Sequence, residues 1–86
     1  MKKVEKILKA LANRRRLAIV KYLNKVRKAS VGDIADEIRL SFKATSKHLV
    51  LLSSADIIEK EQVSLRMIYR LSSPLHNILK TVLPIL

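Results

Sequence analysis

Residues 40–52, LSFKATSKHLVLL, bring together side chains that carry positive charge and donate hydrogen bonds. On a helix, the spacing places Lys43, Ser46 and Lys47 on one side and apolar residues on the other. Lysine can donate to guanine O6 and N7, and serine can donate or accept, so this face could read base edges in the major groove of DNA. The same lysines could contact phosphate alone, and a solvated helix face contains similar residues.

The net charge favours a polyanionic partner. The 86-residue chain has 18 lysines and arginines against 7 acidic residues, which gives a formal charge of +11. The excess is concentrated in residues 1–28, where Glu5 is the sole acidic residue. Nucleic acid is the commonest polyanion that such a charge attracts, although solubility or nonspecific adhesion would follow from it as well.

Enzymatic and metal chemistry have little support in the sequence. The chain contains no cysteine, which excludes disulfides and thiolate ligands. It has no glycine-rich phosphate loop and no serine–histidine–acid set at a recognisable spacing, so we expect no catalytic residue and no cofactor. His48 and His76 are isolated, and a single imidazole does not make a metal site.

The length indicates one domain, residues 1–86, with a thin hydrophobic core. Association of two copies would compensate for that core, because disulfides are excluded. No apolar run approaches the roughly 18–20 residues of a membrane span. The basic N-terminal residues also lack the apolar region of a signal peptide. We therefore expect a cytoplasmic protein with no membrane partner.

Hydrophobic spacing predicts five helices. The expected ranges are residues 3–12, 14–25, a short third helix ending near 38, then 42–54 and 74–83. Asn13, Ser30 and Ser41 are suitable N-cap residues, and Pro74 is expected at the first position of the last helix.

Residues 57–71 lose the helical period and are rich in strand formers, which indicates a β-hairpin. The order is therefore ααααββα, a mainly α protein with a small hairpin. Two short helices joined by a tight turn and followed by a hairpin are typical of a winged helix-turn-helix. In such a fold the second helix enters the major groove.

Four blocks of the chain resemble the ArsR-type (arsenic-repressor-like) winged-helix transcriptional regulators. LKALANRRRLAIVKYL is similar to the family's opening LKALADPTRLRILRLL. SVGDIADEIRLSFKATSKHLVLLSSADII is similar to its TVSELAEALGLSQSTVSRHLKVLREAGLV. EKEQVSLRMIYRLS resembles the wing, and the last helix stands where the family has its final dimerisation helix. The most specific part runs from residue 40 to 52, with Ser46, His48 and Leu49 in place.

The resemblance implies a homodimeric repressor that reads an inverted-repeat operator in double-stranded DNA. The recognition-helix residues expected to contact DNA are Ser41, Phe42, Lys43, Thr45, Ser46 and Lys47. The wing residues are Lys60, Gln62, Ser64 and Arg66. Candidates for the DNA backbone are Arg14, Arg15 and Arg16, for which a solvated basic face is the alternative. The terminal helices would form the dimer interface through residues that also belong to the core: Val4, Ile7, Leu8, Leu11, Leu75, Ile78, Leu79 and Val82.

The chain departs from the family at several positions. Ser30 and Gly32 replace the Cys-x-Cys of soft-metal sensors, and the last helix lacks the ligands of zinc sensors, so no metal is expected and the effector is unknown. Phe42 stands where a polar residue is frequent. It would either pack under the turn or touch a thymine methyl group. Ser64 replaces the usual glycine of the wing tip.

Three other functions compete with this interpretation. A winged helix can present the same surface to a protein partner, because fold does not determine function. The charge could also act on nucleic acid without sequence preference. Association of the basic first helix with a membrane surface is disfavoured, because that helix has no aromatic anchor.

Overall fold

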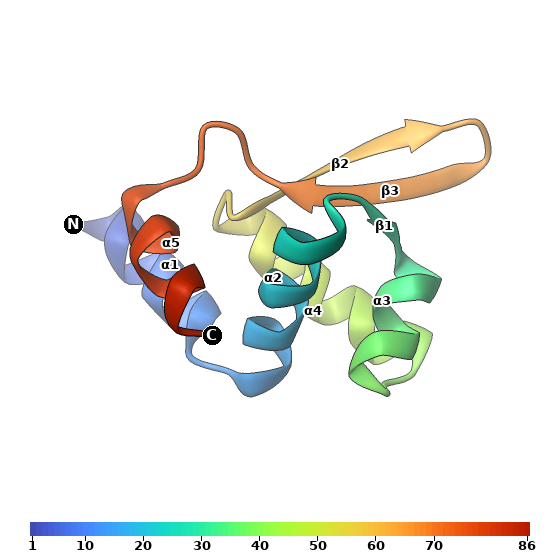
Figure 1. Cartoon of the computed structure of the whole chain (residues 1–86), viewed down its shortest axis with the longest axis horizontal. Helices are drawn as coiled ribbons and strands as arrows, with labels where there is room; N and C mark the ends of the chain where they lie inside the picture. Colours follow the sequence, from blue (N-terminus) through green and yellow to red (C-terminus); the bar gives the residue numbers. More distant parts are fainter.

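The computed structural model describes residues 1–86 and shows helices packed beside a small sheet (Figure 1). The helices are α1 (Lys2–Leu11), α2 (Arg14–Val26), α3 (Val31–Ile38), α4 (Phe42–Ser54) and α5 (Asn77–Val82), followed by a 3-10 turn, Leu83–Ile85. The strands are β1 (Ala29–Ser30), β2 (Ile58–Val63) and β3 (Arg66–Leu71). The predicted winged helix-turn-helix is confirmed, since α3 and α4 are joined by a tight turn and β2 and β3 form the wing.

Side-chain caps begin four of the helices, three of them at residues expected from the sequence. Asn13 Oδ1 accepts two backbone N–H groups in the first turn of α2, at 2.9 and 3.1 Å. Ser30 Oγ accepts an N–H of α3 at 3.2 Å, and Ser41 Oγ accepts one of α4 at 3.1 Å. Each cap satisfies donors that have no partner within the helix. The three N-caps expected from the sequence are therefore confirmed.

The sheet is antiparallel, with the order β1-β3-β2. Strands β2 and β3 pair along their whole length, so the wing turns through Ser64 and Leu65 alone. Ser64 has a φ of 58°, and a positive φ at the first position of a two-residue turn fits the type II′ pattern. Strand β1 was not expected from the sequence. Its two residues pair with the middle of β3 and attach the wing to the helices.

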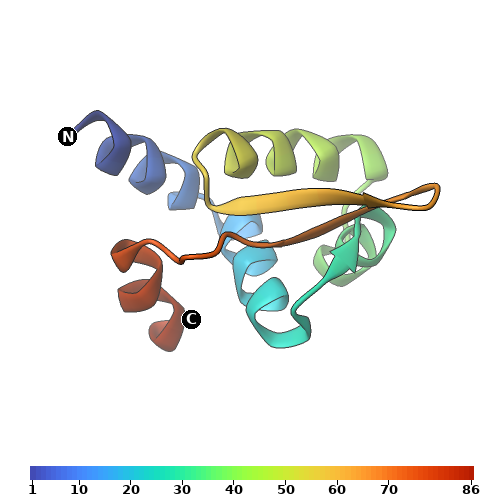
Figure 2. The same ribbon diagram turned by 90° about the horizontal axis from the view of Figure 1, so that it is seen from above.

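The core lies between the helices and the sheet. Fully buried side chains come from all five helices and from the entry to β2: Ile7, Ile19, Leu23, Ile34, Leu49, Leu52, Ile57 and Leu79. Helix α4 runs beside β2, and the tip of the wing projects beyond the helices (Figure 1, Figure 2). The helix-turn-helix and the wing therefore share one rigid base.

The end of the chain differs from the expected helix over residues 74–83. Helix α5 begins at Asn77, and its N-cap is His76, whose Nδ1 accepts the N–H of Ile78 at 3.0 Å. Pro74 lies in the connection before the helix instead of at its first position. The expected start was wrong because a histidine nitrogen, and not a serine hydroxyl, supplies the cap. None of the helices combines the length and the apolar composition that a membrane-spanning segment requires.

Candidate nucleic-acid interface

The outward face of α4 begins with a capped turn and continues with cationic side chains. Lys43 and Lys47 are exposed and take part in no ion pair. Ser46 is half-buried between them, and Phe42 is 65% exposed at the first position of the helix. The structure thus brings together five of the six recognition-helix residues predicted from the sequence, Ser41 included.

Thr45 is the sixth, and the expectation that it contacts DNA is wrong. Its exposure is 0%, and it lies on the side of α4 that buries Leu49 and Leu52. Residues four and seven positions further along share its face, so the helical period turns position 45 toward the core. Thr45 Oγ1 has no hydrogen-bond partner, although it is fully buried.

Arg15 and Arg16 donate hydrogen bonds to backbone carbonyls at the C-terminal ends of other helices. The Arg15 guanidinium donates to the carbonyl of Ile38 and, at 3.2 Å, to that of Arg39, where α3 ends. Arg16 Nε donates to the Ala10 carbonyl at 2.5 Å, near the end of α1. A cation at a helix C-terminus satisfies free carbonyls and complements the helix dipole.

These contacts correct the expectation that all three arginines face the DNA backbone. Arg15 and Arg16 are half-buried, and their guanidinium groups are held by acceptors within the chain. Arg14 alone of the three is exposed, and it forms no ion pair. One of the three candidates therefore stays available to an external phosphate.

Arg16 also contacts α4 through His48. Arg16 Nη1 lies 3.2 Å from His48 Nδ1. A guanidinium can only donate, so Nδ1 accepts and the imidazole is neutral with its proton on Nε2. Burial lowers the pKa of His48, and the positive charges of Arg16 and Arg15 lower it further. His48 is thus a hydrogen-bonded packing residue that joins α4 to α2.

The wing presents a second set of polar groups. Lys60, Gln62, Ser64 and Arg66 are all exposed. Lys60 forms no ion pair, whereas Arg66 Nη2 lies 3.9 Å from Asp33 Oδ2 on α3. An exposed pair at this distance adds little stability, so Arg66 can exchange Asp33 for a phosphate at small cost.

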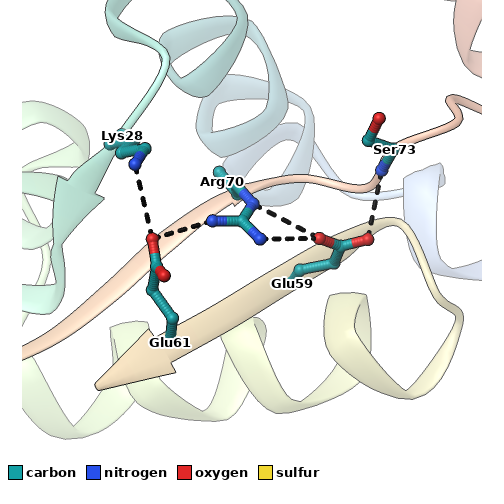
Figure 3. A network of polar contacts seen from close by, with 5 residues as sticks. All are labelled: Lys28, Glu59, Glu61, Arg70 and Ser73. Atoms are coloured by element: carbon teal, nitrogen blue, oxygen red, sulfur yellow. Dashed lines mark hydrogen bonds and ion pairs between the residues drawn. The ribbon is translucent and has the colours of Figure 1, made fainter. Parts of the chain in front are cut away.

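A network of charges holds the base of the wing (Figure 3). Arg70 Nη1 lies 2.8 Å from Glu61 Oε1, and Arg70 Nη2 lies 3.3 Å from Glu59 Oε2. Glu61 also meets Lys28 at 3.4 Å, and Glu59 accepts the N–H of Ser73 at 3.1 Å. The network joins the wing to the segment that follows α2 and to the segment that leads to α5. Lys28 and Arg70 are thus paired within the chain.

The comparison with known proteins agrees with this geometry. Residues 13–60 match the family described as bacterial regulatory protein, arsR family. The chain belongs to this family. The resemblance drawn from the sequence is therefore confirmed, and the relatives of the chain are regulators and not enzymes. No curated protein sequence matches the chain significantly.

Solved structures similar to this arsR-family chain span nearly its whole length. HlyU from Vibrio cholerae N16961 has a TM-score of 0.84 and 30% identity, covering 96% of this chain and 90% of that chain. Mb0332 from Mycobacterium bovis, described as a homodimeric winged helix-turn-helix DNA-binding domain, has a TM-score of 0.87 and 27% identity over 98% and 78%. NolR from Sinorhizobium fredii has a TM-score of 0.84 and 27% identity over 98% and 80%.

In this arsR-family protein, lysines of α1 meet the C-terminal end of α4. Lys6 borders two hollows there and shares both with Ser54. Lys2 lines one of them, and neither lysine forms an ion pair. The sequence shows that α1 is basic, but it carries no signal that α1 and α4 are neighbours. These lysines extend the cationic surface beyond the recognition helix.

The apolar residues expected at a dimer interface divide into two groups. Ile7, Leu11 and Leu79 have exposures of 1%, 5% and 0%, so they belong to the core of the single chain. The core role expected for these three is confirmed, and the interface role expected beside it is wrong, because they have almost no exposed surface. Val4 and Leu8 are 37% and 51% exposed, and with Met1 they line a shallow hollow of about 480 Å³ on α1.

The C-terminal helix contributes a smaller apolar surface. Leu75, Ile78 and Val82 are half-buried, and Ile85 in the final turn is 80% exposed. The two ends of the chain thus expose apolar side chains that the core does not cover.

The structure brings no three histidine, cysteine, aspartate or glutamate side chains together in an arrangement that could hold a metal ion. His76 accepts a backbone N–H at the start of α5, and His48 accepts from Arg16. Both histidines therefore have a structural role.

Proposed function

We propose that this arsR-family protein is a homodimeric, sequence-specific DNA-binding repressor that reads an inverted-repeat operator through α4. One observation carries the proposal. The first two turns of α4 present Lys43 and Lys47 to solvent with no acidic partner, while the opposite face of the same helix is buried in the core. A rigidly held helix with unpaired donors on its outer face suits a groove lined with acceptors.

The contacts with DNA would be of two kinds: those that read base edges and those that position the protein on the backbone. In a helix-turn-helix, the N-terminal residues of the second helix meet base edges in the major groove. Lys43 and Ser46 would read bases there, with Lys47 reading a base or holding a phosphate. Lys60 and Arg66 of the wing would reach the backbone or the minor groove. Such phosphate contacts position the protein without reading sequence.

The N-terminal helix would widen the footprint on the backbone. Lys2, Lys6 and Arg14 are exposed and form no ion pair, and the first two lie beside the end of α4. Each phosphate that they neutralise would release a counterion, so affinity should fall steeply as salt rises.

Two observations support the homodimer. Apolar side chains of α1 and of the final turn stand exposed, notably Leu8 at 51% and Ile85 at 80%. Exposed apolar groups of this kind often mark association surfaces when they form a patch, and Met1, Val4 and Leu8 line one hollow on α1. The similar domain Mb0332 is described as homodimeric. A dimer that reads two half-sites one turn of DNA apart must hold its two α4 helices about 34–36 Å from each other.

The first experiment is selection from a random-sequence duplex library at near-physiological salt, followed by sequencing of the retained DNA. Enrichment of an inverted repeat is expected, and light scattering should give the mass of two chains. If the protein retained DNA without enriching any sequence, and lost that DNA as the salt concentration rose, sequence-specific recognition would be contradicted. A variant with Lys43→Ala and Lys47→Ala is the matched control and should retain no enriched sequence.

Repression itself needs a separate measurement. The enriched sequence is placed across a promoter, and transcription from that template is compared with one whose half-sites are scrambled. Addition of the protein should lower transcription from the first template alone. Equal transcription from both would contradict a repressor and leave DNA binding in place.

A further inference from the structure

We propose that Phe42 reads the methyl group of a thymine, so that the operator contains a T·A pair facing the first residue of α4. The inference rests on the proposed function, because it assumes that α4 enters the major groove. It adds the identity of one base pair and the side chain that selects it.

Phe42 is not part of the hydrophobic core. It is the only phenylalanine of the chain, it is 65% exposed, and it lies outside the group of side chains that pack against the core. The alternative that it packs under the turn is therefore not what the structure shows. The bond from Ser41 Oγ to the N–H of Ala44 fixes the first turn, so Phe42 stands at the leading end of the helix.

Beside the cationic line, the outward face of α4 has a second line with an apolar side chain at each end and a serine between them. Phe42, Ser46 and Val50 are spaced four residues apart and therefore follow one another along the helix. Val50 is 66% exposed. Lys43 and Lys47 form the neighbouring line, one residue further around. The lysines can bind polar base edges or phosphates, but Phe42 and Val50 can do neither.

The major groove offers one kind of apolar group to such a side chain. Its edges carry hydrogen-bond donors and acceptors, and the C5 methyl of thymine is the exception. A phenyl ring placed over polar edges would remove water from them without replacing the lost hydrogen bonds, which is unfavourable. A T·A pair facing Phe42 avoids this cost and buries apolar surface on both partners.

The neighbours of Phe42 favour DNA over a protein partner. Along the helix the ring is flanked by Ser41, Lys43 and Ser46, so no other large exposed apolar side chain of α4 adjoins it; Val50 and Leu51 lie two turns or more away. The positive end of the α4 dipole and the unpaired Lys43 favour an anionic ligand at this place. A protein partner would require a broader apolar surface at its centre.

Deoxyuridine tests the inference, because it pairs like thymine and lacks the methyl group. Each thymine of the selected half-site is replaced in turn, and affinity is measured by anisotropy. One position should show a loss of about fourfold, the value for burying a single methyl group. The variant Phe42→Ala should bind the T and U duplexes equally at that position. Phe42→Leu, which keeps an apolar contact, should retain the discrimination.

Val50→Ala is the matched control, because Val50 is as exposed as Phe42 but lies two turns away. It should leave the discrimination at that position intact. A wild-type protein that binds T and U duplexes equally everywhere would overturn the inference, as would discrimination that persists in Phe42→Ala. In both cases, loss of operator binding in the Lys43 and Lys47 variant would leave the proposed function standing. Failure to enrich any sequence would instead overturn the proposed function, and the inference with it.

Discussion

Helices α2 and α4 both carry basic residues in their first turns, and these residues make opposite kinds of contact in the structure. At the start of α2, Arg15 and Arg16 are half-buried and donate to the carbonyls that end α3 and α1. In the first turns of α4, Lys43 and Lys47 are exposed and unpaired. The difference shows that nearby acceptors, and not the number of charges, separate a structural cation from one that is free to bind a ligand.

The helix dipole gives these two sets of cations different energetic consequences. Cations near a helix N-terminus are unfavourable by a few tenths of a kcal/mol to about 1 kcal/mol each. In α2 this cost is offset, because the arginines reach the negative ends of two other helices. In α4 nothing within the chain offsets it, and a DNA phosphate would do so.

Removing the α4 lysines gives the largest expected effect on binding. The double variant Lys43→Ala, Lys47→Ala should bind the selected operator about 100-fold more weakly, since each lysine contact contributes roughly 1–2 kcal/mol. Its free energy of unfolding in urea should change by less than about 0.5 kcal/mol, because both side chains are solvated. A loss of affinity below about threefold would mean that α4 is not the recognition helix.

Arg16→Met should show the converse pattern. The free energy of unfolding should fall by about 2 kcal/mol, because the carbonyls of Ala10 and Lys9 and the ring of His48 lose their donor. Urea denaturation measures this change, and methionine keeps the apolar stem in place. Arg14→Met is the control and should stay within about 0.5 kcal/mol of the wild type. Equal effects of the two variants would show that the helix-end contacts contribute nothing to stability.

The variant Thr45→Val tests whether position 45 acts in the core or on the DNA-facing side of α4. Valine has nearly the same shape, and it removes a buried hydroxyl that has no hydrogen-bond partner. The free energy of unfolding, measured in urea, should therefore rise by about 1 kcal/mol, while the affinity for the operator stays unchanged. Weaker DNA binding would place Thr45 on the outer face after all. A less stable variant would show that the hydroxyl has a partner.

His48 gives the smallest effect, which appears as a pH dependence. Its pKa is lowered in the folded protein, so the unfolded chain takes up a proton first as the pH falls. The stabilisation is complete above about pH 6.5 and is lost below it, with a slope of at most about 1.4 kcal/mol per pH unit. Urea titrations of the wild type and of His48→Gln, from about pH 8 to pH 5, should diverge at the acidic end. Parallel curves would show that burial and the neighbouring arginines do not lower the pKa of His48 in the folded protein.

Local signals made the helix-turn-helix predictable. Ser30 and Ser41 are capping residues placed directly before apolar periods, and residues 42–54 are the bounds that the structure gives α4. The outward position of Lys43 and Lys47 follows from the same period, because a helix that buries one face must expose the other.

Contacts between distant segments were not predictable in this way. The carbonyls that Arg15 reaches lie 23 and 24 residues further along the chain, and nothing near Arg15 indicates them. Strand β1 has two residues, too few to show a period of two. A single apolar stripe contains both Leu79 and its half-buried neighbours, so the pattern alone cannot assign one to the core and the others to an interface.

The charges on β2 have a consequence for the behaviour of many copies together. Strand β2 lies at the edge of the sheet, where unpaired backbone groups could recruit the same strand of another molecule. An antiparallel match centred on Lys60 would set Lys60 against Lys60 and Glu59 against Glu61. Parallel alignment in register would oppose each charge to its own copy, and like charges directly opposite each other are destabilising. The glutamates that anchor the wing thus also protect it from edge-to-edge aggregation at high concentration.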